Sequence, residues 1–271
     1  MLLPNITVVA GLAGAGKTTW ICQEIANNID TQNFSSNVLY FSLGTGNLPI
    51  DQTRLLAEFP HIQVFFDGQE VEFIKQLALS DLAYIEIGFY LDLSNISNLL
   101  GDKSYNRVAI VSENSNDSEY HSWAQKIISG ALIQDNFTGN HLTQNQLWRA
   151  PTSGQVIDEE SLREFWYELT NGAYGNITRC KGVFDVADGR SLYADFVAGV
   201  PSPEFIELNL PRNLEGRPER FSGMEVLGEN LDAVVIKQTL EDCCLSDAAI
   251  LQAQEQVKEA LLDEGSGETL F

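Results

Sequence analysis

Short apolar runs alternate with stretches of helical spacing through the first half of the chain. The runs at 6–10, 38–41 and 82–85 are continuous, which is typical of strands buried on both faces of a sheet. Residues 70–79 instead place apolar side chains at helical intervals. Strands that alternate with helices predict right-handed crossovers and a parallel, doubly wound α/β sheet. The same series predicts a helix after residue 16, a short helix capped by Asp51 that ends at Phe59, and strands at 62–66 and 107–111.

The pattern changes near residue 153. Residues 158–170 predict a helix with an acidic first turn, and several strands separated by Gly, Pro and Asp turns follow it. Hairpin-like spacing followed by a helix predicts a smaller α+β unit. We therefore expect a first domain at 1–153, a second at 154–245 with its linking helix, and an acidic helix and tail at 246–271. The expected strands of the second domain are 178–186, 191–198, 205–210 and 221–227, and its later helix is 231–243.

Residues 113–153 carry the weakest periodicity. Residues 120–128 have helical spacing, and the apolar run at 131–134 is expected to be the last strand of the sheet. Residues 136–154 are polar and rich in turn formers, so they favour a loop. The first domain is therefore expected to end in a long loop.

A glycine-rich turn directly follows the first apolar run. Residues 11–19 read GLAGAGKTT, which matches G-x-x-x-x-G-K-[ST], the phosphate-binding P-loop. Glycines allow the backbone N–H groups to turn toward phosphates, and the following helix adds the positive end of its dipole. Lys17 brings a positive charge to the β- and γ-phosphates, and the Thr18 hydroxyl is placed to bind Mg²⁺. The residues expected to bind a nucleotide are Gly11, Gly14, Ala15, Gly16, Lys17, Thr18 and Thr19.

The charge and the cysteines limit the partners and the compartment. The formal net charge of −22 argues against binding to nucleic acid or to an anionic membrane, because both need a cationic surface. Four cysteines without a C-x-x-C pair favour free thiols in a reducing compartment. No apolar run approaches the length of a membrane span, and no signal peptide is recognisable. We therefore expect a cytoplasmic protein.

Three segments together resemble the CobW family of P-loop GTPases. They are the P-loop, the sequence FWYEL at 165–169 leading into RCKGVF at 179–184, and the sequence FSGMEVLGENLD at 221–232. Members of that family are described as metal-chaperone or metal-insertase GTPases. The resemblance implies GTP or ATP with Mg²⁺ as cofactors, a role in metal homeostasis, and a metalloprotein client.

The resemblance also implies roles for two acidic residues. Glu86 ends a predicted strand where the family has a Glu-x-x-Gly motif, so Glu86 and Thr18 are the expected Mg²⁺ residues. Residues 43–51 align with the switch segment of the family and keep Gly46, Ile50 and Asp51. Asp51 is expected to orient the attacking water, with Lys17 as the second catalytic residue.

Two family motifs are missing from the chain. The metal motif Cys-x-Cys-Cys should fall between residues 62 and 72, where there is no cysteine. The guanine-reading motif Asn-Lys-x-Asp should follow the strand expected at 131–134, where the chain reads DNFT. Three isolated histidines, His61, His121 and His141, favour surface or core positions over a metal site.

Two functional classes follow from these observations. The first is a slow nucleoside triphosphatase that prefers GTP and whose switch loop responds to the γ-phosphate and Mg²⁺. The second is an adaptor that binds nucleotide without turnover and acts through its C-terminal domain. A small-molecule kinase shares the P-loop, but no lid with paired arginines is recognisable between residues 113 and 154.

Overall fold

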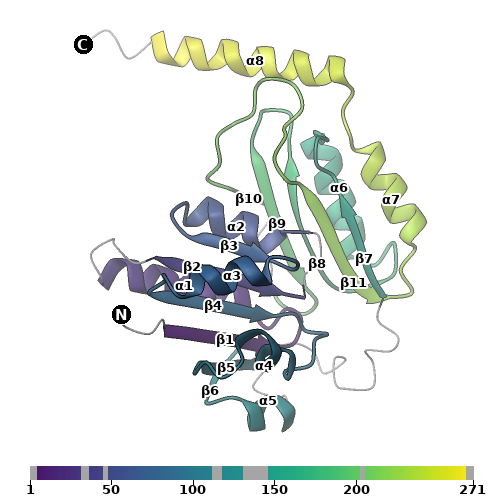
Figure 1. Ribbon diagram of the computed structural model, residues 1–271. Coiled ribbons are helices and arrows are strands. Elements are labelled where there is room, and N and C mark those ends of the chain that lie inside the picture. The colour runs from purple at the N-terminus through teal and green to yellow at the C-terminus, as the bar shows by residue number, and fades with distance from the viewer. Residues whose placement is uncertain are drawn as a thin grey trace. The chain divides into compact units, whose positions relative to one another are not determined.

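The structure is a computed structural model that describes residues 5–31, 37–44, 48–111, 118–130, 146–201 and 205–266. The chain divides into two compact units, Met1–Thr143 and Gln144–Phe271. Each unit is built around one sheet (Figure 1). The division falls before the boundary expected at residue 153, because a strand between these two points belongs to the second sheet.

The first unit contains a six-stranded parallel sheet with the order β3-β2-β4-β1-β5-β6. The predicted parallel α/β fold is confirmed. Because all six strands run in the same direction, their carboxyl ends meet at one edge, where ligands bind in such sheets. The strands are β1 (Asn5–Gly11), β2 (Val38–Leu43), β3 (Gln63–Phe66), β4 (Leu82–Ile87), β5 (Asn106–Val111) and β6 (Lys126–Ser129).

Helices cover both faces of this sheet. Phe73 of α3 is fully buried, and its ring stacks on Phe41 of β2 at a centroid distance of 4.8 Å. On the opposite face, Asn28 of α1 donates a hydrogen bond to the Tyr84 hydroxyl of β4 (3.0 Å). The helices are α1 (Lys17–Thr31), α2 (Ile50–Glu58), α3 (Glu70–Leu77), α4 (Asn95–Leu100) and α5 (Ser118–Trp123), of which α3, α4 and α5 share one hydrophobic cluster.

The helix expected at 120–128 is wrong in its second half. Helix α5 ends at Trp123, and residues 126–129 form β6 beside β5. The open edge of β5 offers hydrogen bonds that outweigh the weak local helical spacing, and the β-branched pair Ile127 and Ile128 suits a strand. The strand expected at 131–134 and the first part of the expected loop lie outside the described residues.

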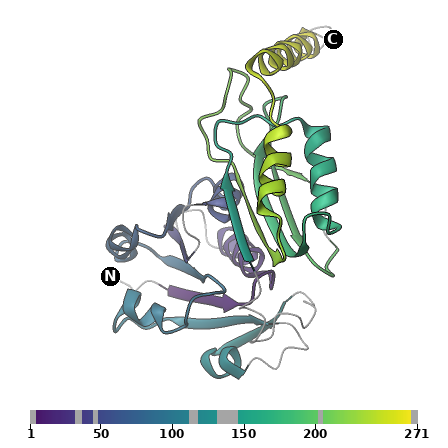
Figure 2. The same cartoon turned by 90° about the vertical axis from the view of Figure 1, so that its right-hand side faces the viewer.

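The second unit contains a five-stranded antiparallel sheet with the order β10-β9-β8-β11-β7. Helices α6 (Glu159–Thr170) and α7 (Ala233–Asp242) lie side by side over one face, as Figure 2 shows. The predicted α+β unit is confirmed, but residues 146–151, expected to be loop, form β7 and pair with β11. The strands are β7 (Gln146–Pro151), β8 (Asn176–Asp185), β9 (Ser191–Val197), β10 (Ile206–Glu207) and β11 (Gly223–Glu229).

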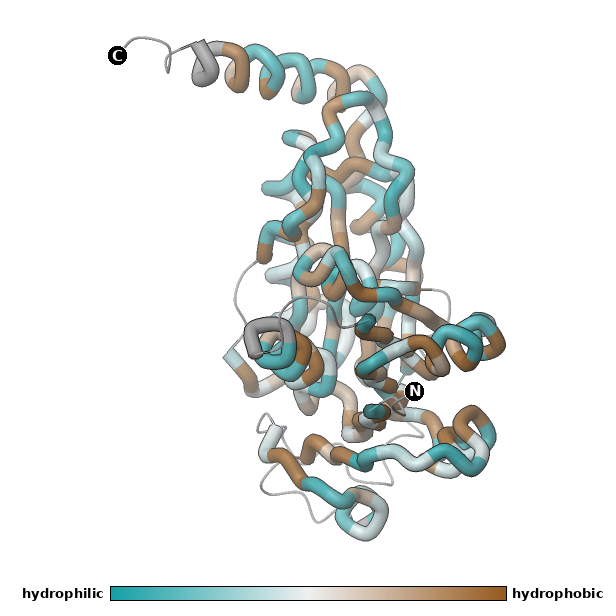
Figure 3. Tube along the Cα trace, turned by 60° about the vertical axis from the view of Figure 1, so that its left-hand side comes forward, coloured by the Kyte–Doolittle hydropathy of each residue, from teal (hydrophilic) through white to brown (hydrophobic). Residues whose placement is uncertain are grey.

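The last helix, α8 (Asp247–Ser266), belongs to the second unit. Ile250 is buried, and the buried Gln254 side chain accepts a hydrogen bond from Gly216 N–H (2.7 Å). Apolar positions recur along the helix, as the brown segments of Figure 3 show, and Leu251 and Leu262 among them are exposed. The expected acidic C-terminal helix is therefore present, and it is held at its first turns.

The face of the second sheet that carries Glu225 holds a buried ion network. Arg149 Nε lies 2.7 Å from one oxygen of Glu225, and Lys181 Nζ lies 3.7 Å from the other. Burial opposes ionisation of Glu225, but the positive charges of Lys181 and Arg149 outweigh it, and the pKa of this carboxyl is lowered. Ionised Glu225 therefore contributes to the stability of the folded unit.

Acid is expected to remove this contribution. Because the pKa of Glu225 is lower in the folded state, its stabilisation is present above the ordinary glutamate value of 4.5 and is lost as the pH falls through the folded value. The free energy of unfolding of Glu225→Gln should be lower than that of wild type at about pH 6, and the difference should shrink toward about pH 3. Urea titrations at both pH values measure this, with Glu164→Gln at an exposed position as the control. A difference that does not change with pH would contradict the prediction.

Candidate functional site

The P-loop lies between the end of β1 at Gly11 and the start of α1 at Lys17. Gly14 and Gly16 have φ values of 76° and 97°, a backbone region that side chains with a Cβ rarely adopt. No described residue accepts a hydrogen bond from the N–H groups of Gly14, Gly16 or Thr18. These donors are therefore available to phosphate oxygens, as the sequence motif predicts.

Lys17 lies over this loop. Its side chain is 5% exposed, and its Nζ donates hydrogen bonds to the carbonyl oxygens of Gly11 and Leu12, both at 3.0 Å. A buried ammonium needs such acceptors, because an uncompensated charge is costly away from water. The loop thus holds the positive charge of Lys17 beside backbone N–H donors. Phosphate oxygens can replace the carbonyl groups of Gly11 and Leu12 as acceptors of the Lys17 hydrogen bonds.

The structure brings Thr18 and Glu86 into direct contact. The Thr18 hydroxyl donates a hydrogen bond to Glu86 Oε2 at 2.9 Å, and the Tyr40 hydroxyl donates to the same oxygen at 3.0 Å. Residue 86 pairs with Val9 of β1, so the parallel register places this carboxylate beside the P-loop. Hydroxyl and carboxylate oxygens are ligands that Mg²⁺ prefers, so this pair fits a magnesium ion.

Asp51 lies in the first turn of α2 and is 3% exposed. It is not the N-cap that the sequence predicted: Pro49 holds that position, and no side chain caps the helix. Burial, then Glu86 and Asp51, raise the pKa of Tyr40 well above its usual value. Burial raises the pKa of Cys22 to about 12, with Glu86 and Asp51 as smaller causes. Both carboxylates therefore act on the same buried side chains next to the P-loop.

Two further residues of this site were not predicted from the sequence. Tyr40 is one, because nothing near it in the chain indicates that its hydroxyl meets Glu86. Gly130 is the other: a Cβ there would lie 2.4 Å from the carbonyl oxygen of Ala15, so only glycine lets the end of β6 approach the P-loop. The sequence pattern predicts a helix at 120–128 instead of β6, so it does not place Gly130 near the P-loop.

The remaining predicted residues lie at the same edge of the sheet. Gly11, Ala15 and Thr18 are buried, and Thr19 is exposed in the first turn of α1. His61 and His121 are exposed, and His141 lies outside the described residues.

The described part of the chain contains no group of three or more His, Cys, Asp or Glu side chains that could hold a metal ion. Among the described helices, none is long and apolar enough to cross a membrane.

Fold and site define the class as a P-loop α/β protein with a separate antiparallel C-terminal unit. Residues 150–244 match the family model described as the cobalamin synthesis protein cobW C-terminal domain. The resemblance to the CobW family is thereby confirmed for the second unit, from the last two residues of β7 to just beyond α7.

Two structures of the YjiA GTPase are among the solved structures similar to this chain. The Zn(II)-bound YjiA GTPase from E. coli is 13% identical with a TM-score of 0.32, over 90% of this chain and 99% of that chain. A Zn(II)-bound triple mutant of the YjiA GTPase is also 13% identical, with a TM-score of 0.31 over the same shares. No curated protein sequence matches the chain.

Proposed function

We propose that the first unit binds a purine nucleoside triphosphate, GTP in preference to ATP, together with Mg²⁺, and hydrolyses it slowly. The observation that carries this proposal is the contact between Thr18 and Glu86 beside the buried ammonium of Lys17. A hydroxyl, a carboxylate and a cation next to free backbone donors form the arrangement that nucleotide phosphates and magnesium need.

Each residue has a role in this proposal. The P-loop amides and Lys17 bind the phosphates, and Thr18 and Glu86 hold the metal. Magnesium supplies charge neutralisation at the phosphate oxygens. Asp51 orients the attacking water, supported by its burial and by its electrostatic effect on Tyr40, whose hydroxyl donates to Glu86. Catalysis then consists mainly of positioning and charge stabilisation.

The second unit connects this activity to metals in the proposal. Its match to the cobW C-terminal domain supports a role in metal homeostasis or metallocofactor assembly, with a metalloprotein as client. We propose that this role is cytoplasmic. The region 154–245, with its linking helix, is the proposed client-binding domain, and the first domain is the proposed nucleotide switch. The family's thiolate metal motif is missing, so thiolate ligands from residues 62–72 are not part of the proposal.

The alternative is an adaptor that binds nucleotide without turnover. The missing Cys-x-Cys-Cys and Asn-Lys-x-Asp motifs favour it. Calorimetric titration of GTP and of ATP, followed by a phosphate-release assay on the same sample, separates the two functions. Binding without release of phosphate supports the adaptor, and release that requires Mg²⁺ supports the hydrolase.

Substitution of Glu86 tests the metal site. Glu86→Gln keeps the side-chain shape and the hydrogen bonds from Thr18 and Tyr40 but removes the negative charge, so Mg²⁺ should strengthen nucleotide binding less. We expect the gain in nucleotide affinity on adding Mg²⁺ to be about tenfold smaller than in wild type, as for other residues that orient metal ligands. Titration of GTP with and without Mg²⁺ measures this, and Glu58→Gln, at an exposed position of α2, is the matched control. Equal gains in wild type and Glu86→Gln would remove Glu86 from the metal site.

A further inference from the structure

A pocket of about 760 Å³ lies between α3 and α4, away from the P-loop. Its floor comes from the end of β2 at Leu43 and Gly44, and its sides come from α3, α4 and the segment that joins β4 to α4. None of its lining residues belongs to the P-loop, and none is Thr18, Asp51 or Glu86. The volume lies within the ~300–1,000 Å³ range of small-molecule sites.

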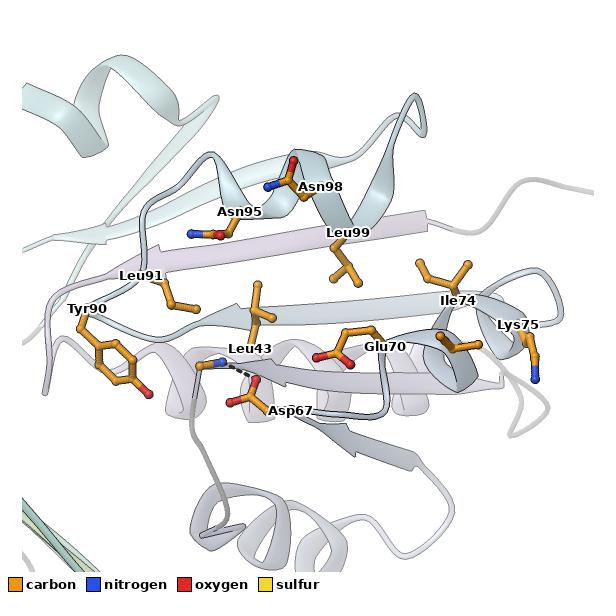
Figure 4. A pocket seen from close by; sticks show the side chains of 12 residues that line it. Leu43, Asp67, Glu70, Ile74, Lys75, Tyr90, Leu91, Asn95, Asn98 and Leu99 are labelled. Atoms are coloured by element: carbon orange, nitrogen blue, oxygen red, sulfur yellow. Dashed lines mark hydrogen bonds between the residues drawn. The ribbon is translucent and has the colours of Figure 1, made fainter.

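The walls of this pocket are aliphatic. Leu43, Ile74, Leu91 and Leu99 come from four different segments of the chain, and Figure 4 shows their side chains grouped around one space. All four are partly buried against the hydrophobic core of the first unit. The pocket therefore offers an apolar surface that is continuous with the core and accessible to a ligand.

Two of the residues that line the pocket, Asp67 and Glu70, carry a carboxylate. Asp67 Oδ1 accepts a hydrogen bond from the N–H of Gly44 at 2.7 Å, which fixes this carboxylate at the end of β2. Glu70 Oε1 accepts from Gly68 N–H at 3.0 Å, and its Oε2 has no hydrogen-bond donor in the part of the chain that the structure describes. Figure 4 shows the carboxylates of Asp67 and Glu70 on the same side of the space, below Leu43 and Leu91.

The one cation of the pocket lining does not pair with Glu70. The Lys75 side chain is 67% exposed, and its Nζ lies 3.6 Å from Glu72 Oε2, outside the pocket lining. The carboxylate of Glu70 thus remains a negative charge that faces the apolar walls. A ligand complementary to this surface is apolar over most of its area and positive at one end.

We propose that the pocket between α3 and α4 binds a small organic cation, an apolar group that carries an ammonium. The apolar group packs against Ile74, Leu91 and Leu99, and the ammonium donates hydrogen bonds to the carboxylate of Glu70. This pocket shares no residue with the P-loop, Asp51 or Glu86, but Leu43 and Gly44 at its floor begin the segment 43–51 that aligns with the family's switch. The proposal does not rest on nucleotide binding, and its test is made without nucleotide. An ammonium attached to an apolar group occurs both in a free amine and at the N-terminus of a peptide that begins with an apolar residue.

Methyl NMR on the full chain tests the proposal with 2-phenylethylammonium chloride and its neutral counterpart 2-phenylethanol. We expect saturable shifts of the Ile74, Leu91 and Leu99 methyl signals, with the ammonium binding about tenfold more tightly than the alcohol, as for one charge-assisted hydrogen bond. Equal affinities for the two probes, or the absence of shifts at these methyl groups, would overturn the proposal. Tighter binding of phenylalanyl-alanine amide than of the free amine would assign the source to a peptide N-terminus, and weaker binding to a free amine; either result supports the ammonium site.

Two variants locate the charge. Glu70→Gln keeps the acceptor for Gly68 N–H and should lower the affinity for the ammonium about tenfold, to that of the alcohol. Glu58→Gln, at an exposed position of α2 outside the pocket lining, should leave both affinities unchanged. Unchanged ammonium binding by Glu70→Gln contradicts the proposal. Lys17→Ala should bind the ammonium as wild type does, so that a failure of the nucleotide proposal is distinguished from a failure of this one.

Discussion

Replacing Lys17 with alanine is expected to weaken the binding of GTP and ATP by about a hundredfold and to abolish phosphate release. The Lys17 ammonium donates two hydrogen bonds at the loop, and each charge-assisted bond to a phosphate contributes about 1.5–3 kcal/mol. Losing about 2.7 kcal/mol of binding energy, which lies within the range for one such bond to a phosphate, corresponds to roughly a hundredfold in affinity. The loss of the same charge from the transition state removes the electrostatic stabilisation on which phosphoryl transfer depends.

Calorimetry measures the affinity, and a phosphate-release assay measures the turnover. Lys103→Ala removes an exposed lysine from the same unit and should behave as wild type in both assays. Lys17→Arg should recover part of the binding but little turnover, because a planar guanidinium does not replace a compact ammonium in a tight loop. Equal rates of phosphate release by wild type and Lys17→Ala would contradict hydrolysis at the P-loop. A hundredfold loss of binding in a protein without turnover would support the adaptor.

The geometry of the proposed phosphate-binding loop is predictable from the sequence because its determinants are local. Glycine at 14 and 16 supplies the backbone conformation, and Lys17 and Thr18 follow directly in the chain. Glu86 is also predictable, because a residue at the end of a buried strand in a parallel sheet faces the same edge as the P-loop. Its exact partners are not, since the Tyr40 hydroxyl reaches Glu86 only after β2 and β4 pair.

The errors fall where tertiary contacts overrule weak local patterns. Residues 126–129 have helical spacing, but the edge of β5 recruits them as β6. Residues 146–151 contain a proline and polar side chains, but β11 pairs with them along their whole length as β7. Both β6 and β7 are edge strands. Edge strands are less buried than central strands, so they carry fewer apolar residues and their sequence predicts a strand less clearly. The pocket between α3 and α4 was missed for a related reason, because its four aliphatic walls come from separate segments.

The sequence FWYEL at 165–169 is one of the segments that suggested the CobW family, and its role in the structure is packing. Phe165 and Leu169 are buried on the inner face of α6, and Tyr167 is exposed. Trp166 is partly buried, with its ring 5.6 Å from that of Phe205. Phe165, Trp166 and Leu169 are therefore part of the hydrophobic core of the second unit.

Replacing Phe165 with alanine is expected to lower the free energy of unfolding of the second unit by about 3–5 kcal/mol, the usual cost of truncating a buried aromatic ring. Phe165 is 1% exposed, and its ring lies 5.9 Å from that of Tyr174. The cavity left behind is enclosed by α6, α7 and the sheet, so the surrounding side chains can fill it only in part. At a urea dependence of about 2 kcal/mol/M, the unfolding midpoint should fall by roughly 2 M.

Tyr167→Ala is the matched control for this truncation. Tyr167 lies two residues further along the same helix and is 69% exposed, so its removal costs the same helix an aromatic side chain without opening a cavity. We expect it to change the free energy of unfolding by less than about 0.5 kcal/mol. Urea titration of both variants, followed by amide signals of the second unit, compares the two costs directly. Similar losses for the two variants would show that α6 contributes to stability through its helical structure, and the proposed packing role of Phe165 would then be wrong.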